Sequence, residues 1–346
     1  MIDYKIRVLK RNMLLEDGTS LFPKKLVFYP TLRCNLNCKM CYQRTHDRFG
    51  EELSIDDIRK IFSNYTFETV MLVGGEIFVR NDIVDIINFF ATISNEVNIQ
   101  TNASLITAQH IEALKVCNKV KNVWISLDGL KETHDRIRGR GVFEKAIKVI
   151  RELDSDTKLH INTVILKENV WELLELYRFL KKENVSSITF QYEMKYNKKE
   201  YEEANIQLAD AGITGSFFSD CVMDSMEFGT LDNIKDIIDM LKNEERECTK
   251  IHFAPCFFAE DPLAYKDLSR MKQHNFICRD LVDGILKVDP AGNVMLCEAM
   301  NLAVYNLRES SIEEIWNSKQ MKQLRKSMCS NNMFELCYRC CCAERY

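Results

Sequence analysis

The segment LVFYPTLRCNLNCKMC, residues 26–41, contains the pattern that decides the fold. It begins with a short apolar run, Leu26–Tyr29, that is typical of a strand buried on both faces of a parallel sheet. Three cysteines follow this strand directly: Cys34, Cys38 and Cys41. Their spacings of four and three residues allow one short loop to wrap around one metal centre.

The three thiolates indicate a soft metal centre with an open position. Soft thiolates select zinc, copper or iron–sulfur clusters, and a [4Fe–4S] cluster ordinarily takes four of them. Three protein ligands leave one position for a small molecule, as in metal centres that engage substrate. The spacing alone fits a zinc knuckle equally, with a fourth ligand such as His46. This loop by itself therefore leaves both kinds of centre open.

Outward from this loop, β-rich runs alternate with amphipathic helical stretches, which is the pattern of βα units in a parallel sheet. Five further strands are expected at Thr69–Val73, Val97–Thr101, Val123–Leu127, Leu159–Ile165 and Ser187–Tyr192. Helices are expected over Ile83–Phe90, Phe143–Ile150 and Val170–Tyr177. Residues that favour the start of a helix stand at Asn81, before the first of these, and at Ser54 and Thr107, before two further helical stretches. Six units fall short of the eight that close a full barrel. We therefore expect an α/β fold with a partial (β/α)6 TIM barrel.

The chain divides by pattern into four segments. Residues 1–25 are expected to be an N-terminal extension and residues 26–192 the barrel core, with ligands gathered at the strand C-termini. Residues 193–277 are polar and irregular apart from a helix near Asn233–Leu241, and we interpret them as a connector. Residues 278–346 predict a small cysteine-rich domain. It contains a strand pair, Ile285–Val288 and Val294–Leu296, and a helix whose capping box is Ser311 with Glu314.

The composition excludes several classes of protein. Hydrophobic residues make up 46% and charged residues 28% of the 346 residues, which argues against disorder and fibrous repeats. A net charge of −4 gives no reason to expect nucleic acid. No apolar run of about 18 residues and no signal peptide is visible, so we expect a cytoplasmic protein without a membrane partner. In a reducing cytosol, its 14 cysteines indicate metal ligands rather than disulfides.

Several expected strand ends carry glycine or polar residues. Gly74-Gly75-Glu76 ends the second strand, Thr101-Asn102 the third, and Ser126-Leu-Asp-Gly129 the fourth. Together with the three cysteines, this set resembles the radical SAM (S-adenosylmethionine) superfamily, and specifically its members with a C-terminal SPASM or twitch extension. The resemblance covers about residues 26–192 and 278–340.

The resemblance implies roles for these residues. It implies that Cys34, Cys38 and Cys41 hold the [4Fe–4S] cluster that cleaves SAM. Six residues are implied to bind SAM, for its amine and carboxylate in particular: Gly74, Gly75, Glu76, Asn102, Ser126 and Arg138. For Asn102, a plain cap of the strand end is an equal alternative. Two positions depart from the family pattern: Met40 replaces an aromatic residue and Ile77 replaces a proline.

A second group of cysteines matches the SPASM and twitch pattern. Cys278, Gly292 and Cys297 have its spacing, and Cys337 and Cys340 form a CxxC pair. The resemblance implies that Cys278, Cys297, Cys337 and Cys340 hold an auxiliary [4Fe–4S] cluster, whereas spacing alone also fits a four-cysteine zinc ribbon. We expect one auxiliary cluster. A second auxiliary cluster stays possible, because four further cysteines could serve as its ligands: Cys256, Cys329, Cys341 and Cys342. The remaining three cysteines are expected to be buried thiols: Cys117, Cys221 and Cys248.

The resemblance implies an oxidoreductase that cleaves SAM reductively to a 5′-deoxyadenosyl radical. This radical is implied to abstract hydrogen from the substrate, and the auxiliary cluster is implied to transfer electrons. A low-potential donor such as flavodoxin or ferredoxin is the implied partner. The favoured substrate is a peptide or protein, although fewer than thirty residues precede the first strand, too few for a leader-binding domain. The alternatives are dehydrogenation of a sugar or aminocyclitol, and a non-catalytic iron–sulfur or zinc sensor. No acid or base is assigned; Asp283 and Glu298 only flank the second cysteine group.

Overall fold

The computed structural model describes residues 17–345, apart from 42–50, 154–156, 184, 220, 224–232, 246–248, 303–304 and 330–332. All six expected strands of the partial barrel are present and parallel. They are β1 (Lys25–Phe28), β2 (Phe67–Leu72), β3 (Ser94–Thr101), β4 (Val120–Ser126), β5 (Lys158–Ile165) and β6 (Ser187–Tyr192). The prediction of an α/β fold with a partial TIM barrel is therefore confirmed.

The sheet is larger than the six-unit core and has nine strands in the order β10-β6-β5-β4-β3-β2-β1-β12-β13. The segment expected as a connector supplies β10 (Lys250–Ala254), which pairs in parallel with β6. The C-terminal segment supplies β12 (Ile285–Val288), which is parallel to β1, and β13 (Val294–Met295), which is antiparallel to β12. Sequence reasoning missed β10 because its polar Lys250 and His252 interrupt the apolar pattern of a buried strand.

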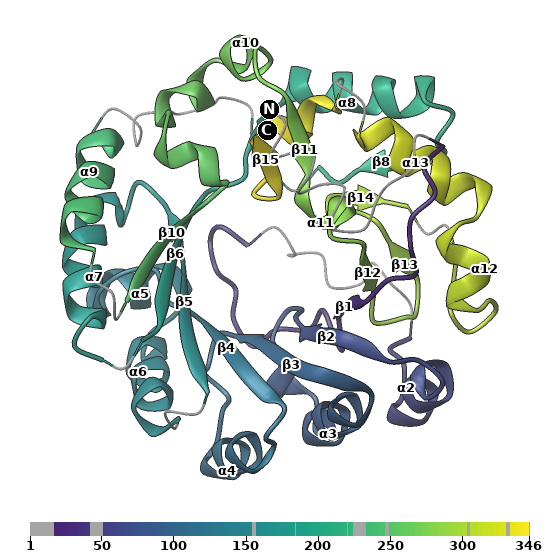
Figure 1. Ribbon diagram of the computed structural model, residues 1–346. Coiled ribbons are helices and arrows are strands. Elements are labelled where there is room, and N and C mark those ends of the chain that lie inside the picture. The colour runs from purple at the N-terminus through teal and green to yellow at the C-terminus, as the bar shows by residue number, and fades with distance from the viewer. Residues whose placement is uncertain are drawn as a thin grey trace.

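Helices cover the convex side of the curved sheet (Figure 1). They are α2 (Ile55–Phe62), α3 (Ile83–Ile93), α4 (Ala108–Val116), α5 (Lys131–Arg138), α6 (Val142–Glu152), α7 (Leu173–Leu180) and α9 (Ile234–Glu244). Ser54 and Thr107 cap α2 and α4 as expected. The start signal at Asn81 is displaced, because α3 begins after Asp82. The Asp82 carboxylate makes no capping bond and instead accepts hydrogen bonds from Arg80.

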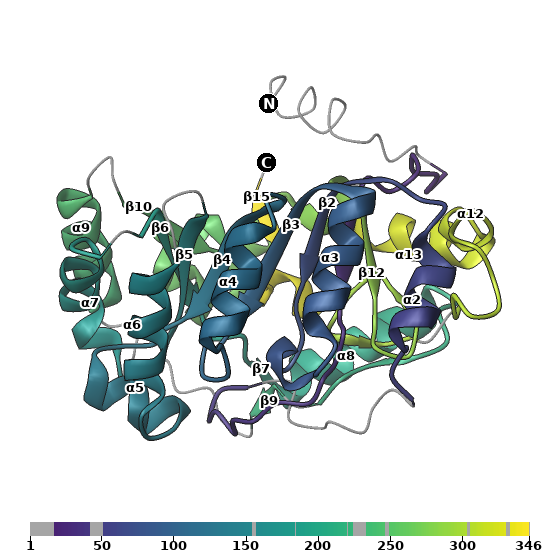
Figure 2. The ribbon, with the colours of Figure 1, turned by 90° about the horizontal axis from the view of Figure 1, so that it is seen from below.

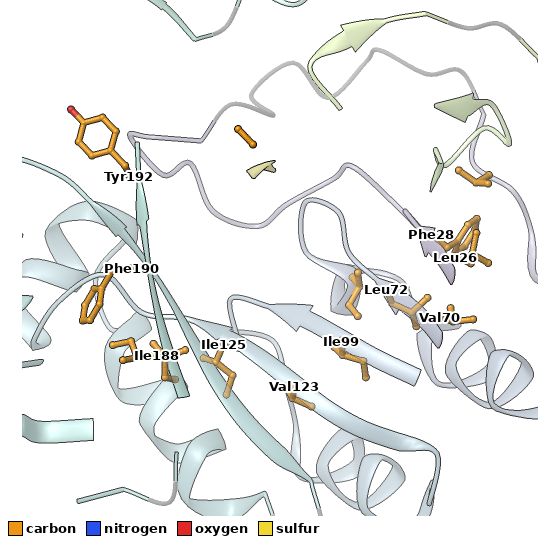
Figure 3. Packing of buried hydrophobic residues seen from close by; sticks show 14 of the residues in the cluster. Leu26, Phe28, Val70, Leu72, Ile99, Val123, Ile125, Ile188, Phe190 and Tyr192 are labelled. Carbon is orange, nitrogen blue, oxygen red and sulfur yellow. The ribbon is translucent and has the colours of Figure 1, made fainter. Parts of the chain in front are cut away.

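The core lies between the sheet and these helices (Figure 3). Every second strand residue points into it, and three of its aromatic side chains, Phe28, Phe62 and Phe90, are fully buried with ring centroids 5.3–5.8 Å apart. Burying one such side chain contributes about 1.5–3 kcal/mol. This packing fixes β1, and the loop with Cys34, Cys38 and Cys41 follows from its C-terminal end.

The remaining segments close one side of the barrel. Their elements are β7 (Tyr196–Asn197), α8 (Lys198–Asp210), β8 (Ser216–Phe217), β9 (Val222–Met223), α10 (Leu268–Met271), β11 (Phe276–Cys278), α11 (Arg279–Val282), β14 (Met300–Asn301), α12 (Ile312–Trp316), α13 (Lys319–Cys329) and β15 (Ala343–Arg345). Ser311 and Glu314 form the expected capping box of α12. Figure 2 shows α12 near α2, where Glu313 accepts a hydrogen bond from the Tyr65 hydroxyl at 2.7 Å. Among the described residues, no helix is long and apolar enough to cross a membrane.

The connector is fastened to the C-terminal cysteine segment by a buried ion pair. Arg339 lies in the short 3-10 helix η6 (Glu335–Arg339) and donates from Nε and Nη2 to the Glu200 carboxylate of α8 at 3.0 and 2.7 Å. The two side chains are only 4% and 8% exposed. A second link is the pairing of β8 with β14. The two segments thus fold as one unit around the cysteines.

We predict that Arg339→Met destabilises the protein by about 3–5 kcal/mol, because the Glu200 carboxylate stays buried without its cation. The double variant Glu200→Met/Arg339→Met should recover much of this loss. Anaerobic urea denaturation measures both. Lys131→Met, which breaks the exposed pair with Glu144, is the control and should leave the unfolding midpoint unchanged.

Candidate active site and auxiliary metal site

The loop that follows β1 carries Cys34, Cys38 and Cys41. Cys38 is buried, whereas Cys34 and Cys41 are half-buried. The Cys41 amide donates to the Cys38 carbonyl at 3.2 Å, and the Leu36 amide donates to Cys34 Sγ at 3.4 Å. None of the twelve cysteines whose side chains the structure describes forms a disulfide. The three thiols therefore keep the chemistry needed for a cluster with one open iron.

Gly74 and Gly75 pack directly against the backbone that leads into this loop. The Gly75 amide donates to the Thr31 carbonyl at 3.1 Å. A Cβ at Gly74 would lie 2.1 Å from the Thr31 carbonyl oxygen, and a Cβ at Gly75 would lie 2.4 Å from the carbonyl oxygens of Leu32 and Arg33. Only glycine allows this approach. The glycines thus position the cysteine loop, a function that the motif alone does not reveal.

The Glu76 carboxylate is 1% exposed and joins the ends of β2 and β3. It accepts hydrogen bonds from the Phe78 amide at 3.1 Å, the Thr101 hydroxyl at 2.8 Å and the Asn102 amide at 2.7 Å. Burial raises its pKa, although these hydrogen bonds act in the opposite direction. Within the described part of the chain, no salt bridge reaches Glu76. A buried carboxylate of this kind fits the ammonium group of a ligand.

The Arg138 guanidinium provides the opposite charge at the same end of the sheet. It donates from Nε to Asp128 Oδ2 at 2.5 Å, and its Nη1 lies 3.9 Å from Cys38 Sγ. Burial disfavours the charged form, but Asp128 together with the thiols of Cys38 and Cys41 raises the Arg138 pKa. Ser126 lies nearby in sequence at the end of β4 and is 8% exposed. A fixed guanidinium beside the cysteine loop fits a ligand carboxylate.

Asn102 forms the strand-end cap considered from the sequence and also contacts the cysteine loop. Its Oδ1 caps the strand end by accepting from the Ser104 amide at 2.8 Å and the Ser104 hydroxyl at 2.6 Å. Its Nδ2 donates to Asn35 Oδ1 at 3.3 Å and lies 3.7 Å from Cys34 Sγ. Asn102 therefore connects the end of β3 to the cysteine loop.

Arg80 is a positioning residue that sequence reasoning missed. Its side chain is buried, and Nη1 donates to the carbonyls of Pro30 and Leu53 at 3.0 and 2.9 Å. It thereby holds the entry to the cysteine loop against the segment before α2. Because backbone carbonyls are its partners, no pattern of side chains indicates this function.

The second group of cysteines gathers around η6. The pKa of the Tyr196 phenol is raised well above its usual range. Burial is the largest cause, followed by the nearby thiols of Cys340, Cys221, Cys297 and Cys337. Cys278 lies near Cys297, and burial with Asp280 and Cys297 raises its pKa to about 12. The structure thus brings all four predicted auxiliary ligands into one region. The thiol-rich composition of this region fits an iron–sulfur cluster.

Further thiols lie in the same region. The sulfur atoms of Cys340, Cys341 and Cys342 are within 4.8 Å of one another. Cys221 was expected to be a buried thiol but is half-buried, and its carbonyl accepts from the Tyr196 amide at 3.0 Å where β7 pairs with β9. Cys117 is likewise half-buried, and Cys256 is exposed. His46, Cys248 and the side chain of Cys329 lie outside the described residues.

The two carboxylates that flank these ligands are held in ion pairs. Asp283 Oδ2 lies 2.9 Å from Lys25 Nζ, and Glu298 Oε1 lies 3.2 Å from Lys287 Nζ. Lys287 is 4% exposed and also pairs with Asp280 at 2.6 Å. The structure therefore orders a buried group of charges beside the auxiliary thiols.

Comparison with known proteins identifies this arrangement. Residues 28–180 match the Radical SAM superfamily, and residues 278–341 match the SPASM iron-sulfur cluster-binding domain. Together these segments span more than half of the chain. The chain belongs to the radical SAM superfamily. As a radical SAM enzyme with a SPASM domain, it uses [4Fe–4S] clusters and SAM as cofactors.

Relatives of this radical SAM enzyme have several activities. The antilisterial bacteriocin subtilosin biosynthesis protein AlbA of Bacillus subtilis is 31% identical over 175 residues, which are 48% of this chain and 39% of AlbA. Fe-coproporphyrin III synthase of Methanosarcina barkeri is 28% identical over 171 residues, which are 48% of this chain and 43% of the synthase. The matched segment thus spans less than half of either relative.

Solved structures share the fold of this radical SAM enzyme. Streptococcus suis SuiB bound to S-adenosylmethionine superimposes with a TM-score of 0.64 at 18% identity, covering 96% of this chain and 74% of SuiB. SuiB has also been solved with its precursor peptide SuiA, and that structure superimposes with a TM-score of 0.62, 18% identity and coverages of 93% and 71%.

We predict that Gly75→Ala prevents iron loading at the three-cysteine loop, because the new methyl group displaces the backbone of residues 32–33. Iron and sulfide analysis after anaerobic reconstitution measures this loss. Gly141→Ala is the control: Gly141 has a φ of +79° but nothing within 4 Å of its Cβ position, so alanine there brings strain without a clash. Normal iron loading in Gly75→Ala would contradict the packing argument.

Proposed function

We propose that this radical SAM enzyme is an oxidoreductase that modifies a peptide or protein by hydrogen abstraction. The observation that carries the proposal is the pairing of β12 with β1. β1 leads into the loop of Cys34, and β12 lies between Cys278 and Cys297 in the chain. The segment that carries Cys278 and Cys297 is therefore built into the same sheet as the strand that leads into the three-cysteine loop.

Each group of residues has a definite part in this proposal. Cys34, Cys38 and Cys41 hold the first cluster, and Cys278, Cys297, Cys337 and Cys340 hold an auxiliary one. When bound, the first cluster supplies the electron that cleaves SAM to methionine and the hydrogen-abstracting 5′-deoxyadenosyl radical, and an auxiliary cluster accepts the electron left on the substrate. The SAM site consists of Gly74, Gly75, Glu76, Asn102, Ser126 and Arg138.

Opposite charges at the strand ends orient the amino-acid part of SAM. The Glu76 carboxylate takes the amine, and the Arg138 guanidinium takes the carboxylate. Asp128 is fully buried and receives the Val164 amide on its other oxygen at 2.8 Å, so it holds Arg138 in one orientation. Such fixed groups lower the cost of ordering the ligand.

The inner wall of the barrel supports a substrate with neutral hydrogen-bonding groups. Alternate strand residues are buried in the helix-facing core, so the residues between them face inward. Five of the half-buried inner residues, beside apolar ones such as Val27, Met71 and Val164, are polar or aromatic: Gln100, Trp124, Asn162, Thr189 and Gln191. The Trp124 ring stacks on His160 at 4.7 Å. Amides and hydroxyls of this kind match the donors and acceptors of a peptide backbone.

The relatives favour a peptide as the substrate. AlbA is a bacteriocin biosynthesis protein, and SuiB has been solved with a precursor peptide.

The second candidate, dehydrogenation of a sugar or aminocyclitol, is favoured by the same amide-rich wall around Trp124, since hydroxyl groups would find the same partners. We propose a flavodoxin or ferredoxin as the electron donor in either case.

The anaerobically reconstituted enzyme should form 5′-deoxyadenosine from SAM and dithionite, as measured by chromatography and mass spectrometry. The triple variant Cys34→Ala/Cys38→Ala/Cys41→Ala should form none, because it lacks the ligands of the first cluster. Cys117→Ala is the matched control and should retain full activity. A chain that loads the first cluster and still forms no 5′-deoxyadenosine would be a sensor instead of an enzyme.

The double variant Cys337→Ala/Cys340→Ala should separate the two parts of the reaction. We expect it to keep SAM cleavage but to lose substrate oxidation, because the electron on the substrate radical has no acceptor. The measurement is mass spectrometry of short peptides encoded beside the gene, in which oxidation removes a pair of hydrogen atoms. Sugars and aminocyclitols form the comparison set, and oxidation confined to them would establish the second candidate.

A further inference from the structure

A buried phenol beside the auxiliary thiols has no hydrogen-bond partner among the residues that the structure describes. Tyr265 belongs to the 3-10 helix η5 (Pro262–Lys266) and is 1% exposed. Within the described ranges, no donor or acceptor reaches its Oη. A buried hydroxyl without a partner costs free energy, because it has lost its bonds to water. Such a group calls for an acceptor other than the side chains around it.

The ring of Tyr265 is fixed by aromatic neighbours. Its centroid lies 4.6 Å from Tyr192, 5.1 Å from Phe258 and 6.0 Å from Phe257. These contacts hold the ring between the end of β6 and the 3-10 helix η4 (Cys256–Ala259). The hydroxyl therefore cannot swing to water without disrupting the packing of this cluster.

The backbone of Tyr265 contacts the residue next to one of the auxiliary cysteines. Its carbonyl accepts a hydrogen bond from Nη1 of Arg339, the residue directly before Cys340. Burial, and then the thiols of Cys341 and Cys340, raise the pKa of the phenol well above its usual range. The phenol is thus a neutral O–H donor at neutral pH, close to at least one predicted ligand of the auxiliary cluster.

We propose that the Tyr265 hydroxyl donates a hydrogen bond to a sulfur atom of the auxiliary cluster and thereby raises the reduction potential of that cluster. Reduction adds negative charge to the cluster sulfurs, so a donor beside them stabilises the reduced form more than the oxidised form. Tyr265 is then a positioning residue that makes the auxiliary cluster a better acceptor for the electron left on the substrate. This inference rests on the proposed auxiliary cluster.

The test is a redox titration of full-length Tyr265→Phe, monitored by electron paramagnetic resonance after anaerobic reconstitution. In the Cys34→Ala/Cys38→Ala/Cys41→Ala background, only auxiliary signals remain. The expected result is unchanged iron content with a more negative auxiliary potential than in the parent protein. Tyr177→Phe is the matched control, since that buried phenol lies 3.3 Å from the carbonyl oxygens of Glu244 and Thr249 on the helical side of the barrel. Its potential should equal that of the parent.

A second measurement separates tuning from structure. In the metal-free protein, Tyr265→Phe should resist urea at least as well as the parent, because the variant removes an unpaired hydroxyl. Equal reduction potentials of the auxiliary cluster in Tyr265→Phe and in the parent would overturn the inference. Failure of the variant to load iron would also overturn it, because the hydroxyl would then act in cluster assembly. If the parent region itself binds zinc or no metal, the proposed auxiliary cluster fails instead.

Discussion

The parallel pairing of β12 with β1 is the contact on which the geometry of this enzyme depends. Its four residue pairs, from Lys25–Ile285 to Phe28–Val288, make the C-terminal segment part of the barrel sheet. Neighbouring strands lie about 4.8 Å apart, so the pairing fixes the C-terminal segment directly beside the strand that leads into the three-cysteine loop. This pairing, together with the β8–β14 pairing and the Arg339–Glu200 ion pair, fixes the SPASM segment relative to the three-cysteine loop. With it, both groups of thiols belong to one rigid frame.

Buried charge is the second constraint, and it acts at the strand ends. Burying a charge is costly unless a partner or hydrogen bonds compensate for it. The fold compensates Glu76 with three donors and Arg138 with Asp128. The same principle applies to Lys287, which lies between Asp280 and Glu298 beside the auxiliary thiols. These groups remain fixed when a zwitterionic ligand arrives, which is what binding SAM at this edge requires.

Most of the barrel could be predicted because its signals are local. The expected strand Ser187–Tyr192 coincides with β6, and the capping boxes of Ser54, Thr107 and Ser311 all form. What could not be predicted depends on neighbours distant in sequence. β10 has a mixed polar pattern, and Cys221 reaches the auxiliary thiols only because β9 pairs with β7. The displaced start of α3 has the same origin, since Arg80 takes the Asp82 carboxylate.

The sequence by itself predicted the class of the enzyme, through the resemblance of its motifs to the radical SAM superfamily. The spacing of Cys34, Cys38 and Cys41 after an apolar strand, with glycines at the next strand end, requires no knowledge of distant contacts. Only the tertiary structure decided that Gly74 and Gly75 serve the cysteine loop and that Arg80 anchors it. It also decided that the buried phenol of Tyr265 finds no partner within the described part of the chain. The physical reason is that spacing along the chain fixes local ligand geometry, whereas close backbone approach and buried hydrogen bonds exist only after the sheet has brought distant segments together.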